Sequence, residues 1–528
     1  MKGTLRQSMA WLHAWSGLVV GWVLFAVFVT GTASYYRSEI SQWMRPELRA
    51  GRSVDAARAA DLAVAALRER APEARTWFVT LPTAELPATQ IAWRSRPGTP
   101  FSVALLDPEA GGPSAARDTR GGDFLYRFHF ELHMPPLWGR WVVGACAMIM
   151  LIALLSGIVT HRRIFADFFT FRRRADQRGW LDAHNVVGVL ALPFHLMITY
   201  TGLVTLMLLY MPWGVNAAYE GNRERFFQDR GQSIAARPPA RAPGELAPLA
   251  PMVREAMRLT GSEAVFVAIH NPRDAASTVV VTMDEPEGIP HLHPSVGFDG
   301  TTGAALGTTG PASAATTTHA TMLGLHEAHF AGPILRVLFF LSGLMGCAMV
   351  ATGLVLWSVA RMPKPNAKPS AEREATARMP LGHRLVHALN VGTVAGLPAA
   401  LACYFLANRL LPASMPGRLD AEVQVFFAAW LLMALPALVV APRRAWTGAL
   451  AAAAALFLAV PVVGGATTGR HLAASLRDGD AAFIGFDLAM LCLALGFALT
   501  AHALGRRPVT RSAGRALPRD GMVGTPSR

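Results

Sequence analysis

Long apolar runs alternate with polar segments along the chain, and the runs are long enough to cross a membrane. A membrane-spanning helix needs roughly 20 mostly apolar residues. Eight segments meet this requirement: 9–36, 138–160, 184–211, 334–358, 385–411, 422–441, 445–466 and 482–504. Of the 528 residues, 52% are hydrophobic and 16% are charged, a composition typical of integral membrane proteins. The first run is too long for the apolar core of a signal peptide and precedes no clear cleavage site, so we expect an anchor.

The net charge of +14 is distributed unevenly along the chain. Basic residues follow the second, fourth and sixth runs and close the chain, in HRRIFADFFTFRRRADQR, ARMPKPNAKPSAEREATAR, APRRAW and GRRPVTRSAGRALPR. Short basic loops mark the cytoplasmic side of a membrane protein. Eight spans therefore place both termini in the cytoplasm and the two long loops outside. Because a lipid bilayer accounts for the basic excess, we expect no nucleic-acid partner.

The first four runs contain an internal repeat. One offset of 171 residues relates four positions of the first run to the third, and one offset of 196 relates three positions of the second run to the fourth. The first set is His13, Gly17, Thr30 and Gly31 with His184, Gly188, Thr201 and Gly202; the second is His133, Arg140 and Gly157 with His329, Arg336 and Gly353. Both copies begin in the cytoplasm, so the repeat is parallel and its pseudo-two-fold axis runs along the membrane normal.

The two outward loops repeat as well. Each begins with an amphipathic stretch that predicts a helix, at 53–70 and 250–259, followed by short β-rich runs. The expected strands are RTWFVTL, TQIAWRS and FSVALLDPEAG in the first loop, and EAVFVAI, STVVVTM and SVGFDGTTGAALG in the second. Both loops end in an Asp-x-x-x-Gly turn signature, at Asp107–Gly111 and Asp299–Gly303. Each loop is long enough for one small α/β domain.

The sequence thus predicts a mainly α-helical integral membrane protein, with about eight spans built on a duplicated two-helix unit and two small α/β domains. The expected boundaries are 1–36 for the first transmembrane helix, 37–137 for the first outward domain, 138–211 for the second and third helices, 212–333 for the second outward domain, 334–360 for the fourth helix, 361–382 for a cytoplasmic linker, 383–505 for a C-terminal four-helix extension and 506–528 for a basic tail.

Histidines at equivalent positions of the repeat suggest a cofactor. Near a two-fold axis His13 is expected to face His184 close to the cytoplasmic side, and His133 to face His329 close to the outer side. Two imidazoles on opposite faces are the axial ligands of a six-coordinate haem b, and helical bundles commonly build such sites from facing helices. Two pairs would hold two haem b groups and carry electrons across the membrane.

Other residues leave the ligand assignment open. His195 follows His184 by three helical turns and competes for the outer site, while His129 and His326 lie in the same outer clusters, FHFELHMPP and LHEAHFAGP. His161 is either an interfacial residue or an alternative inner ligand. Arg140 and Arg336 lie within spans and are expected to pair with a haem propionate or with a carboxylate such as Glu131 or Glu327.

The remaining histidines receive simpler interpretations. Those in the last third are expected to be structural: His383, His387, His471 and His502. His291 and His293 belong to an outward domain, where a solvated loop is the first expectation and metal binding the second. All four cysteines lie in spans, where we expect them to pack as apolar side chains.

Several long stretches resemble the PepSY-associated transmembrane family: WLHAWSGLVVGWVLFAVFVTGT, SGIVTHRRIFADFFTFR, DAHNVVGVLALPFHLMITYTGLV and LHEAHFAGPILRVLFFLSGLMGCAMVATGLVLW. The resemblance covers residues 1 to about 360, and the last third resembles the four-helix extension of some members. It implies a four-helix core with two PepSY-like periplasmic domains in the bacterial inner membrane. It also implies similarity to haem-containing reductases of ferric siderophores.

The family motifs map onto individual histidines of this chain. They assign His13 and His184 in the first and third spans, and the outer motifs fall on His133 or His129 and on His326. The internal repeat instead selects His329 for the last position, so both residues remain candidates.

The histidine pairs together with the resemblance imply transmembrane electron transfer that reduces a periplasmic ferric siderophore. Siderophore oxygens are hard ligands that hold Fe(II) less well than Fe(III), so reduction would favour release. No GxGxxG motif stands in a strand-to-helix context, and the electron donor would be quinol or a separate cytoplasmic reductase. We assign no catalytic side chain. The alternatives are a component of a siderophore or metal transporter, and a non-catalytic PepSY regulatory scaffold.

Overall fold

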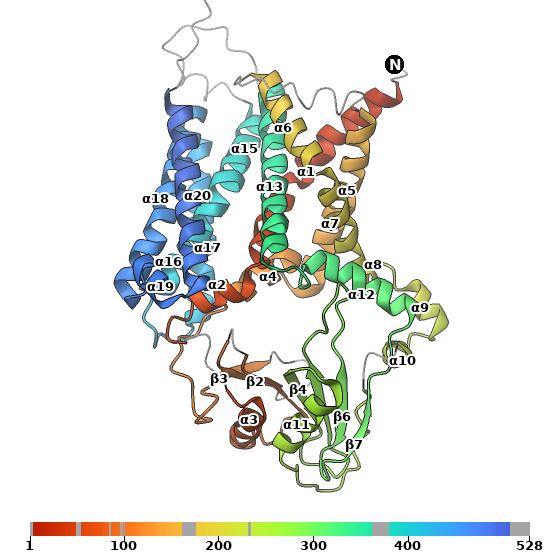
Figure 1. Ribbon diagram of the computed structural model, residues 1–528. Helices are drawn as coiled ribbons and strands as arrows, with labels where there is room; N and C mark the ends of the chain where they lie inside the picture. The colour runs from red at the N-terminus through yellow and green to blue at the C-terminus, as the bar shows by residue number, and fades with distance from the viewer. Residues whose placement is uncertain are drawn as a thin grey trace, which may run out of the picture.

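The computed structural model describes residues 4–48, 54–83, 86–94, 99, 101–160, 176–230, 234–361 and 380–506. A bundle of long helices stands on one side of the molecule and a single β-sheet with its helices on the other (Figure 1). The protein is an integral membrane protein of mainly helical fold, as the sequence predicts, and it has one small α/β domain where the sequence predicts two. We refer to the end of the bundle next to the sheet as the sheet side, and to the opposite end as the far side.

The described residues contain all eight expected spans. Seven are helical segments long and apolar enough to cross a membrane, and a bent helix pair supplies the eighth. The first four spans are α1 (Leu5–Ser34), α5 (Pro136–Thr160), the pair α6 (Gln177–Leu190) with α7 (Leu192–Thr205), and α13 (Pro333–Arg361). The N-terminal end of α1 lies on the far side (Figure 1).

The third span is broken rather than straight. Helices α6 and α7 meet at an angle of 67° around Ala191. Pro193 lies in the first turn of α7, where its missing N–H and its ring interrupt the hydrogen-bond ladder of a continuing helix. His184 and His195 consequently lie on two differently directed helices, whereas the sequence suggested one continuous face.

The last four spans form a second bundle beside the repeat unit (Figure 1). They are α15 (Leu381–Val391) continued by the π-helical turn Gly392–Gly396 and α16 (Leu397–Leu410), α17 (Arg418–Ala434) continued by the 3₁₀ turn Leu435–Leu438, α18 (Pro442–Thr468) and α20 (Ala481–Arg506). The short helix α19 (Leu472–Asp478) joins the last two.

The two outward loops form one sheet together. The strands are β1 (Thr76–Thr80), β2 (Thr89–Trp93), β3 (Ser102–Leu106), β4 (Ala264–His270), β5 (Thr278–Met283), β6 (Ser295–Asp299) and β7 (Ala305–Thr308). Their order is β3-β2-β1-β4-β5-β6-β7, and all neighbours are antiparallel. The first strand of each loop thus pairs with the first strand of the other, so the two expected α/β units are halves of a single domain.

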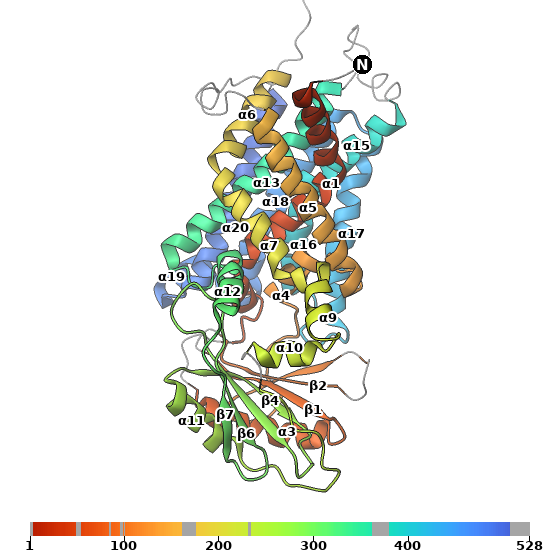
Figure 2. The same cartoon turned by 90° about the vertical axis from the view of Figure 1, so that its right-hand side faces the viewer.

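The hydrophobic side of this sheet is covered by one helix from each loop, α3 (Ala56–Arg70) and α11 (Leu249–Thr260), as Figure 2 shows. Val79 and Val267, which are paired across β1 and β4, are fully buried in the same core as Ala60 and Val253 of these helices. Burying this apolar surface once, in a common core, exposes less of it than two separate small domains would.

Both Asp-x-x-x-Gly turns have the expected geometry. The carboxylate of Asp107 accepts hydrogen bonds from the backbone N–H groups of Glu109 and Ala110, both at 2.9 Å. Asp299 accepts from the N–H groups of Thr301 and Thr302 at 2.9 and 3.0 Å. Gly111 and Gly303 have positive φ angles of 73° and 74°, which glycine adopts without the strain that a Cβ adds.

Short helices lie between the sheet and the bundle (Figure 2). They are α2 (Arg37–Trp43), α4 (Gly122–Glu131), α8 (Met207–Tyr210), α9 (Trp213–Ala218), α10 (Arg223–Asp229) and α12 (Ala314–Glu327). Helices α4 and α12 immediately precede α5 and α13, the second spans of the two repeats. Neither of these two helices is among the elements expected from the sequence.

Candidate functional site

Two histidines of the repeat face each other on the far side of the bundle. The ring centroids of His13 on α1 and His184 on α6 are 6.1 Å apart. Nδ1 of His13 is hydrogen bonded to the carbonyl of Ala153 on α5 at 2.8 Å, and Nδ1 of His184 to the carbonyl of Met349 on α13 at 2.9 Å. These two carbonyls are related by the repeat offset of 196. We call His13 and His184 the far-side pair.

A second pair lies on the sheet side. His129 on α4 and His326 on α12 have ring centroids 6.0 Å apart. Nδ1 of His129 is hydrogen bonded to the carbonyl of Val27 on α1 at 2.8 Å, and Nδ1 of His326 to the hydroxyl of Thr201 on α7 at 3.1 Å. Fourteen residues of α1 separate His13 from Val27, which is ~21 Å along a helix. We call His129 and His326 the sheet-side pair.

The glycines that recur in both copies of the repeat have a steric role at both histidine pairs. A Cβ on Gly31 would lie 2.5 Å from Nδ1 of His129, and one on Gly202 would lie 2.9 Å from Cε1 of His326. A Cβ on Gly157 or Gly353 would lie 3.3 or 3.1 Å from Cε1 of His13 or His184. Each of the four imidazoles therefore packs against a glycine of a neighbouring helix. Gly31 and Gly202 are equivalent positions of the repeat, and so are Gly157 and Gly353.

A cavity of about 570 Å³ opens beside the sheet-side pair. Both histidines line it, together with Gly31, Gly202 and apolar side chains of α1, α5 and α7. Such a volume lies within the range of cofactor and ligand sites, roughly 300–1,000 Å³. On the far side, a Cβ on Gly17 would meet no atom within 4 Å, so the helix face one turn from His13 borders open space.

Arg140 and Arg336 line the same cavity. Nη2 of Arg140 lies 2.7 Å from Oε1 of Glu131, the partner proposed from the sequence. Arg336 is paired instead with Glu39 at the start of α2, and its Nε donates to the carbonyl of Tyr35 at 2.7 Å. Glu39 follows the first span and is far in sequence from Glu131 and Glu327, the carboxylates expected to pair with the arginines, so the sequence did not identify it as the partner of Arg336.

The expected facing of His133 and His329 is wrong. His133 is exposed and its ring centroid lies 5.5 Å from that of Phe427, whereas His329 is exposed and its Nε2 lies 3.0 Å from Glu327. Leu132 and His133 have φ angles of 52° and 54° and Ala328 one of 57°. These left-handed residues end α4 and α12 and turn the chain toward α5 and α13, so a histidine beyond them leaves the helix face.

A difference in loop length explains why the offset of 196 pointed to His133 and His329 instead of His129 and His326. The connection between α4 and α5 comprises residues 132–135, and that between α12 and α13 comprises 328–332. This difference of one residue shifts the repeat register, so His129 and His326 differ by 197 rather than 196.

The other candidate histidines are not in either pair. His195 on α7 is fully buried, and both its ring nitrogens lack a hydrogen-bond partner among the described residues. Its centroid lies 6.0 Å from that of Phe28 on α1. His161 lies outside the described residues. Of the last-third histidines, His471 has the expected structural role, since its Nδ1 accepts from the backbone N–H of Ala474 and caps α19.

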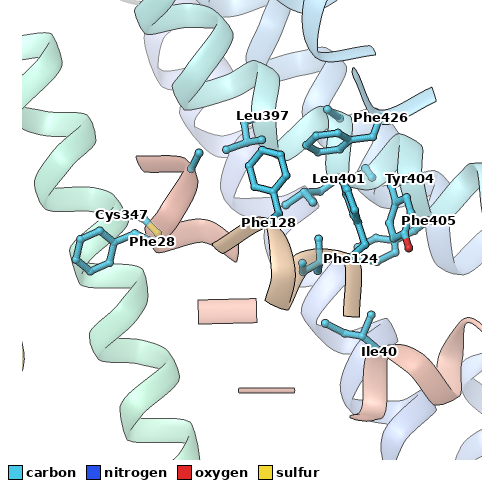
Figure 3. Close-up of a cluster of buried hydrophobic side chains, with 14 of the residues drawn as sticks. Phe28, Ile40, Phe124, Phe128, Cys347, Leu397, Leu401, Tyr404, Phe405 and Phe426 are labelled. Carbon is cyan, nitrogen blue, oxygen red and sulfur yellow. The ribbon is translucent and has the colours of Figure 1, made fainter. Parts of the chain in front are cut away.

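The C-terminal bundle holds α4 in position. Phe124 and Phe128 of α4 pack against Phe426 of α17 at centroid distances of 5.2 and 5.7 Å, and Figure 3 shows these rings in one cluster with Tyr404. The hydroxyl of Tyr404 donates to the carbonyl of Gly121, the N-cap of α4, at 3.0 Å. His129 thus projects from a helix whose opposite side is anchored in the C-terminal extension.

Burial keeps the sheet-side pair neutral. Desolvation lowers the pKa of His129 and lowers the pKa of His326 to about 4, because a charged imidazole is disfavoured away from water. Neutral imidazole is the form that binds a metal through a ring nitrogen.

Both pairs have a ring separation that fits bis-histidine haem b. Two imidazoles that bind one metal ion from opposite sides, with metal–nitrogen bonds of about 2.0–2.1 Å, have centroids about 6 Å apart. Ligating histidines usually donate the other ring N–H to a carbonyl or another acceptor, and Nδ1 of all four histidines has an oxygen partner. The cavity, the glycine contacts and the two arginines at the sheet-side pair supply space for a macrocycle and cations for its propionates.

A protein-family model described as the PepSY-associated TM region matches residues 10–360. The chain belongs to this family. The matched PepSY-associated region comprises both histidine pairs and both halves of the sheet, and ends where the C-terminal bundle begins. The chain is also 28% identical to an uncharacterized protein of Pseudomonas aeruginosa over 410 residues, covering 71% of this chain and 92% of that protein.

Proposed function

We propose that this PepSY-associated protein holds two haem b groups and transfers electrons across the bacterial inner membrane to a ferric siderophore in the periplasm. The observation that carries the proposal is the presence of two histidine pairs at opposite ends of one four-helix unit, with centroid distances of 6.1 and 6.0 Å. A bound haem b supplies reversible one-electron chemistry. The basic segments in the sequence support cytoplasmic termini and a periplasmic sheet domain.

The side chains of the pairs define how the cofactors would be held. Hydrogen bonds at Nδ1 orient each ring and leave Nε2 as the nitrogen that would hold a haem iron. Arg140 and Arg336 offer guanidinium groups toward the sheet-side cavity, where a carboxylate ligand forms charge-assisted hydrogen bonds. The far-side pair would take electrons from quinol or a cytoplasmic reductase, and the sheet-side pair would pass them outward.

The sheet-side cavity determines where a ferric chelate would react. Polar residues at the end of α12 and just after it line part of the cavity, among them Glu327 and His329. A ferric siderophore that docks between the sheet and the bundle would approach the sheet-side pair without entering the apolar interior. Reduction weakens iron binding by its hard oxygen ligands, so docking at this cavity is followed by release of Fe(II).

The test is the absorption spectrum of the purified protein, oxidised and then reduced with dithionite. We expect the Soret shift and split α/β bands of six-coordinate haem b, and two haem groups per chain by pyridine haemochromogen. His13→Ala and His184→Ala should each remove the same haem group, and His129→Ala and His326→Ala the other. The exposed His133, four residues after His129, provides the control: His133→Ala should retain both groups.

Two results would count against the proposal. If all four pair variants keep the haem content of the parent protein, the pairs are not ligands. If haem binds as expected but the reduced protein is not reoxidised anaerobically by any ferric hydroxamate or catecholate chelate, the siderophore reductase assignment fails while the electron-transfer site stands.

A further inference from the structure

Three histidines and two glutamates cluster where the sheet domain meets the bundle. Glu285, His291 and His293 lie in the connection between β5 and β6, Glu327 ends α12, and His329 follows it. The ligand atoms of Glu285, His291 and His293 all lie within 4.8 Å of one another, and so do those of His291, Glu327 and His329. His291 belongs to both groups and so connects the sheet domain to the end of α12.

Two histidines of the first group are directed at the same carboxylate. Nδ1 of His291 and Oε1 of Glu285 are buried and in contact with each other. Nε2 of His293 lies 3.2 Å from the same carboxylate oxygen. Two imidazole nitrogens and one carboxylate oxygen thus gather within a few ångströms, close enough for all three to bind a single ion.

The surroundings orient these ligands. Nδ1 of His293 is hydrogen bonded to the carbonyl of Met283 at 3.0 Å, the outer contact typical of a metal-bound histidine. The backbone N–H of His291 donates to the carbonyl of Ala320 on α12 at 3.0 Å. A Cβ on Gly324 would lie 1.7 Å from the carbonyl oxygen of Ile289, so only glycine allows this loop to rest on α12. The loop is therefore docked rather than solvated.

We propose that Glu285, His291 and His293 form a binding site for one divalent first-row transition-metal ion, and that the ion it receives is Fe(II) released from the chelate. Two histidines and one carboxylate are a donor set that suits Fe(II). Nε2 of His291 also lies 4.0 Å from Oε2 of Glu327, and Glu327 and His329 line the sheet-side cavity. The second group is the path by which the ion passes from the cavity to the site.

The metal site stands on its own geometry, whereas the identity of the ion as Fe(II) rests on the proposed function. Metal binding is measured by equilibrium dialysis of the full-length protein against Co²⁺, a probe that haem iron does not obscure in elemental analysis. We expect one Co²⁺ per chain in the parent protein, and affinity at least about tenfold lower in His291→Ala, His293→Ala and Glu285→Gln. His270→Ala removes a histidine at the end of β4, outside the cluster, and should bind as the parent does.

The outcomes separate the two proposals because haem is counted in the same samples. Haem without Co²⁺ binding, or equal Co²⁺ affinity in the parent and the His291→Ala variant, overturns the metal site and leaves the electron-transfer proposal intact. Co²⁺ binding without haem upholds the site and contradicts the proposed function. Excess Fe²⁺, added anaerobically, should displace Co²⁺; failure to do so at any excess overturns the assignment to iron.

Discussion

At the scale of single residues, the histidine pairs depend on glycines that the neighbouring helices present to them. The shortest approach is at Gly31, where a Cβ would lie 2.5 Å from a ring atom of His129. Nothing else in the sequence identifies these glycines as neighbours of a histidine, because glycine is common in transmembrane helices for many reasons. Their recurrence at fixed offsets was visible in the sequence; the contact that explains it required the structure.

Substituting Gly31 should therefore disturb a histidine on another helix. In Gly31→Ala the new methyl group and the His129 ring cannot both keep their places, and overpacking of this kind costs ~1–3 kcal/mol. We expect a lower thermal midpoint and loss of the haem group held by the sheet-side pair, with the far-side group retained. Gly448→Ala in α18 adds a Cβ that meets no atom within 4 Å, and should leave both quantities unchanged. Equal haem content in the two variants would contradict the steric explanation.

At the scale of elements, the long apolar helices and the strands were predictable from the sequence, and the short helices between the sheet and the bundle were not. Spans and strands carry strong signals, since their hydrophobic runs and alternation extend over many residues. Helix α4 has only ten residues, GDFLYRFHFE, its left-handed end at Leu132 and His133 contains no glycine, and the prolines that follow mark the start of α5 rather than the end of α4. The sequence therefore named the correct outer clusters but could not decide between His129 and His133.

The turn that follows β6 makes the stability of the sheet domain depend on pH. Burial of Asp299 opposes its charge, but hydrogen bonds from Thr301 and Arg237 outweigh this and hold the pKa of the carboxyl well below its usual range. A depressed folded-state pKa gives stability that is present above the unfolded-state value of about 3.9 and is lost as the pH falls below it. The domain should therefore lose stability in acid through this carboxylate.

Two variants separate the charge of Asp299 from its role in the turn. Asp299→Asn keeps an oxygen for the backbone N–H groups but loses the ion pair with Arg237, whose Nη1 lies 2.6 Å from the carboxylate. Asp299→Ala loses both and should cost roughly 1–2 kcal/mol. Thermal midpoints should show a deficit of Asp299→Asn at pH 7 that shrinks toward pH 3. A deficit independent of pH would show that the charge contributes nothing.

At the scale of the whole molecule, the two repeats meet twice, once through histidine pairs in the bundle and once through the pairing of β1 with β4. Repeat-equivalent strands that pair antiparallel are what a two-fold axis between them produces, so the sheet and the bundle share one symmetry. The strands are predictable from the sequence, but their union in one domain is not, because each loop has enough residues for a domain of its own. The long-range pairing between residues 76–80 and 266–270 leaves no local pattern in either segment.

Cross-linking tests whether the two loops form one sheet. Phe78 on β1 is directly opposite Ala268 on β4, and Cα atoms of directly opposite residues lie about 4.5–5.5 Å apart, within the range that a disulfide spans. The double variant Phe78→Cys with Ala268→Cys should form an intramolecular disulfide on mild oxidation, detected as a linked peptide pair by mass spectrometry without reduction.

The matched control combines Phe78→Cys with Val103→Cys. Val103 is in the same cross-strand row on β3, beyond Ala92 of β2, and two strand spacings of about 4.8 Å put it out of reach. Linkage of the first pair without the second establishes that β1 and β4 join the two loops in one sheet. The sheet then restrains α4 and α12, the helices that carry His129 and His326. Absence of the first link, or equal formation of both, would mean that the loops are separate domains and that only the bundle keeps the sheet-side pair together.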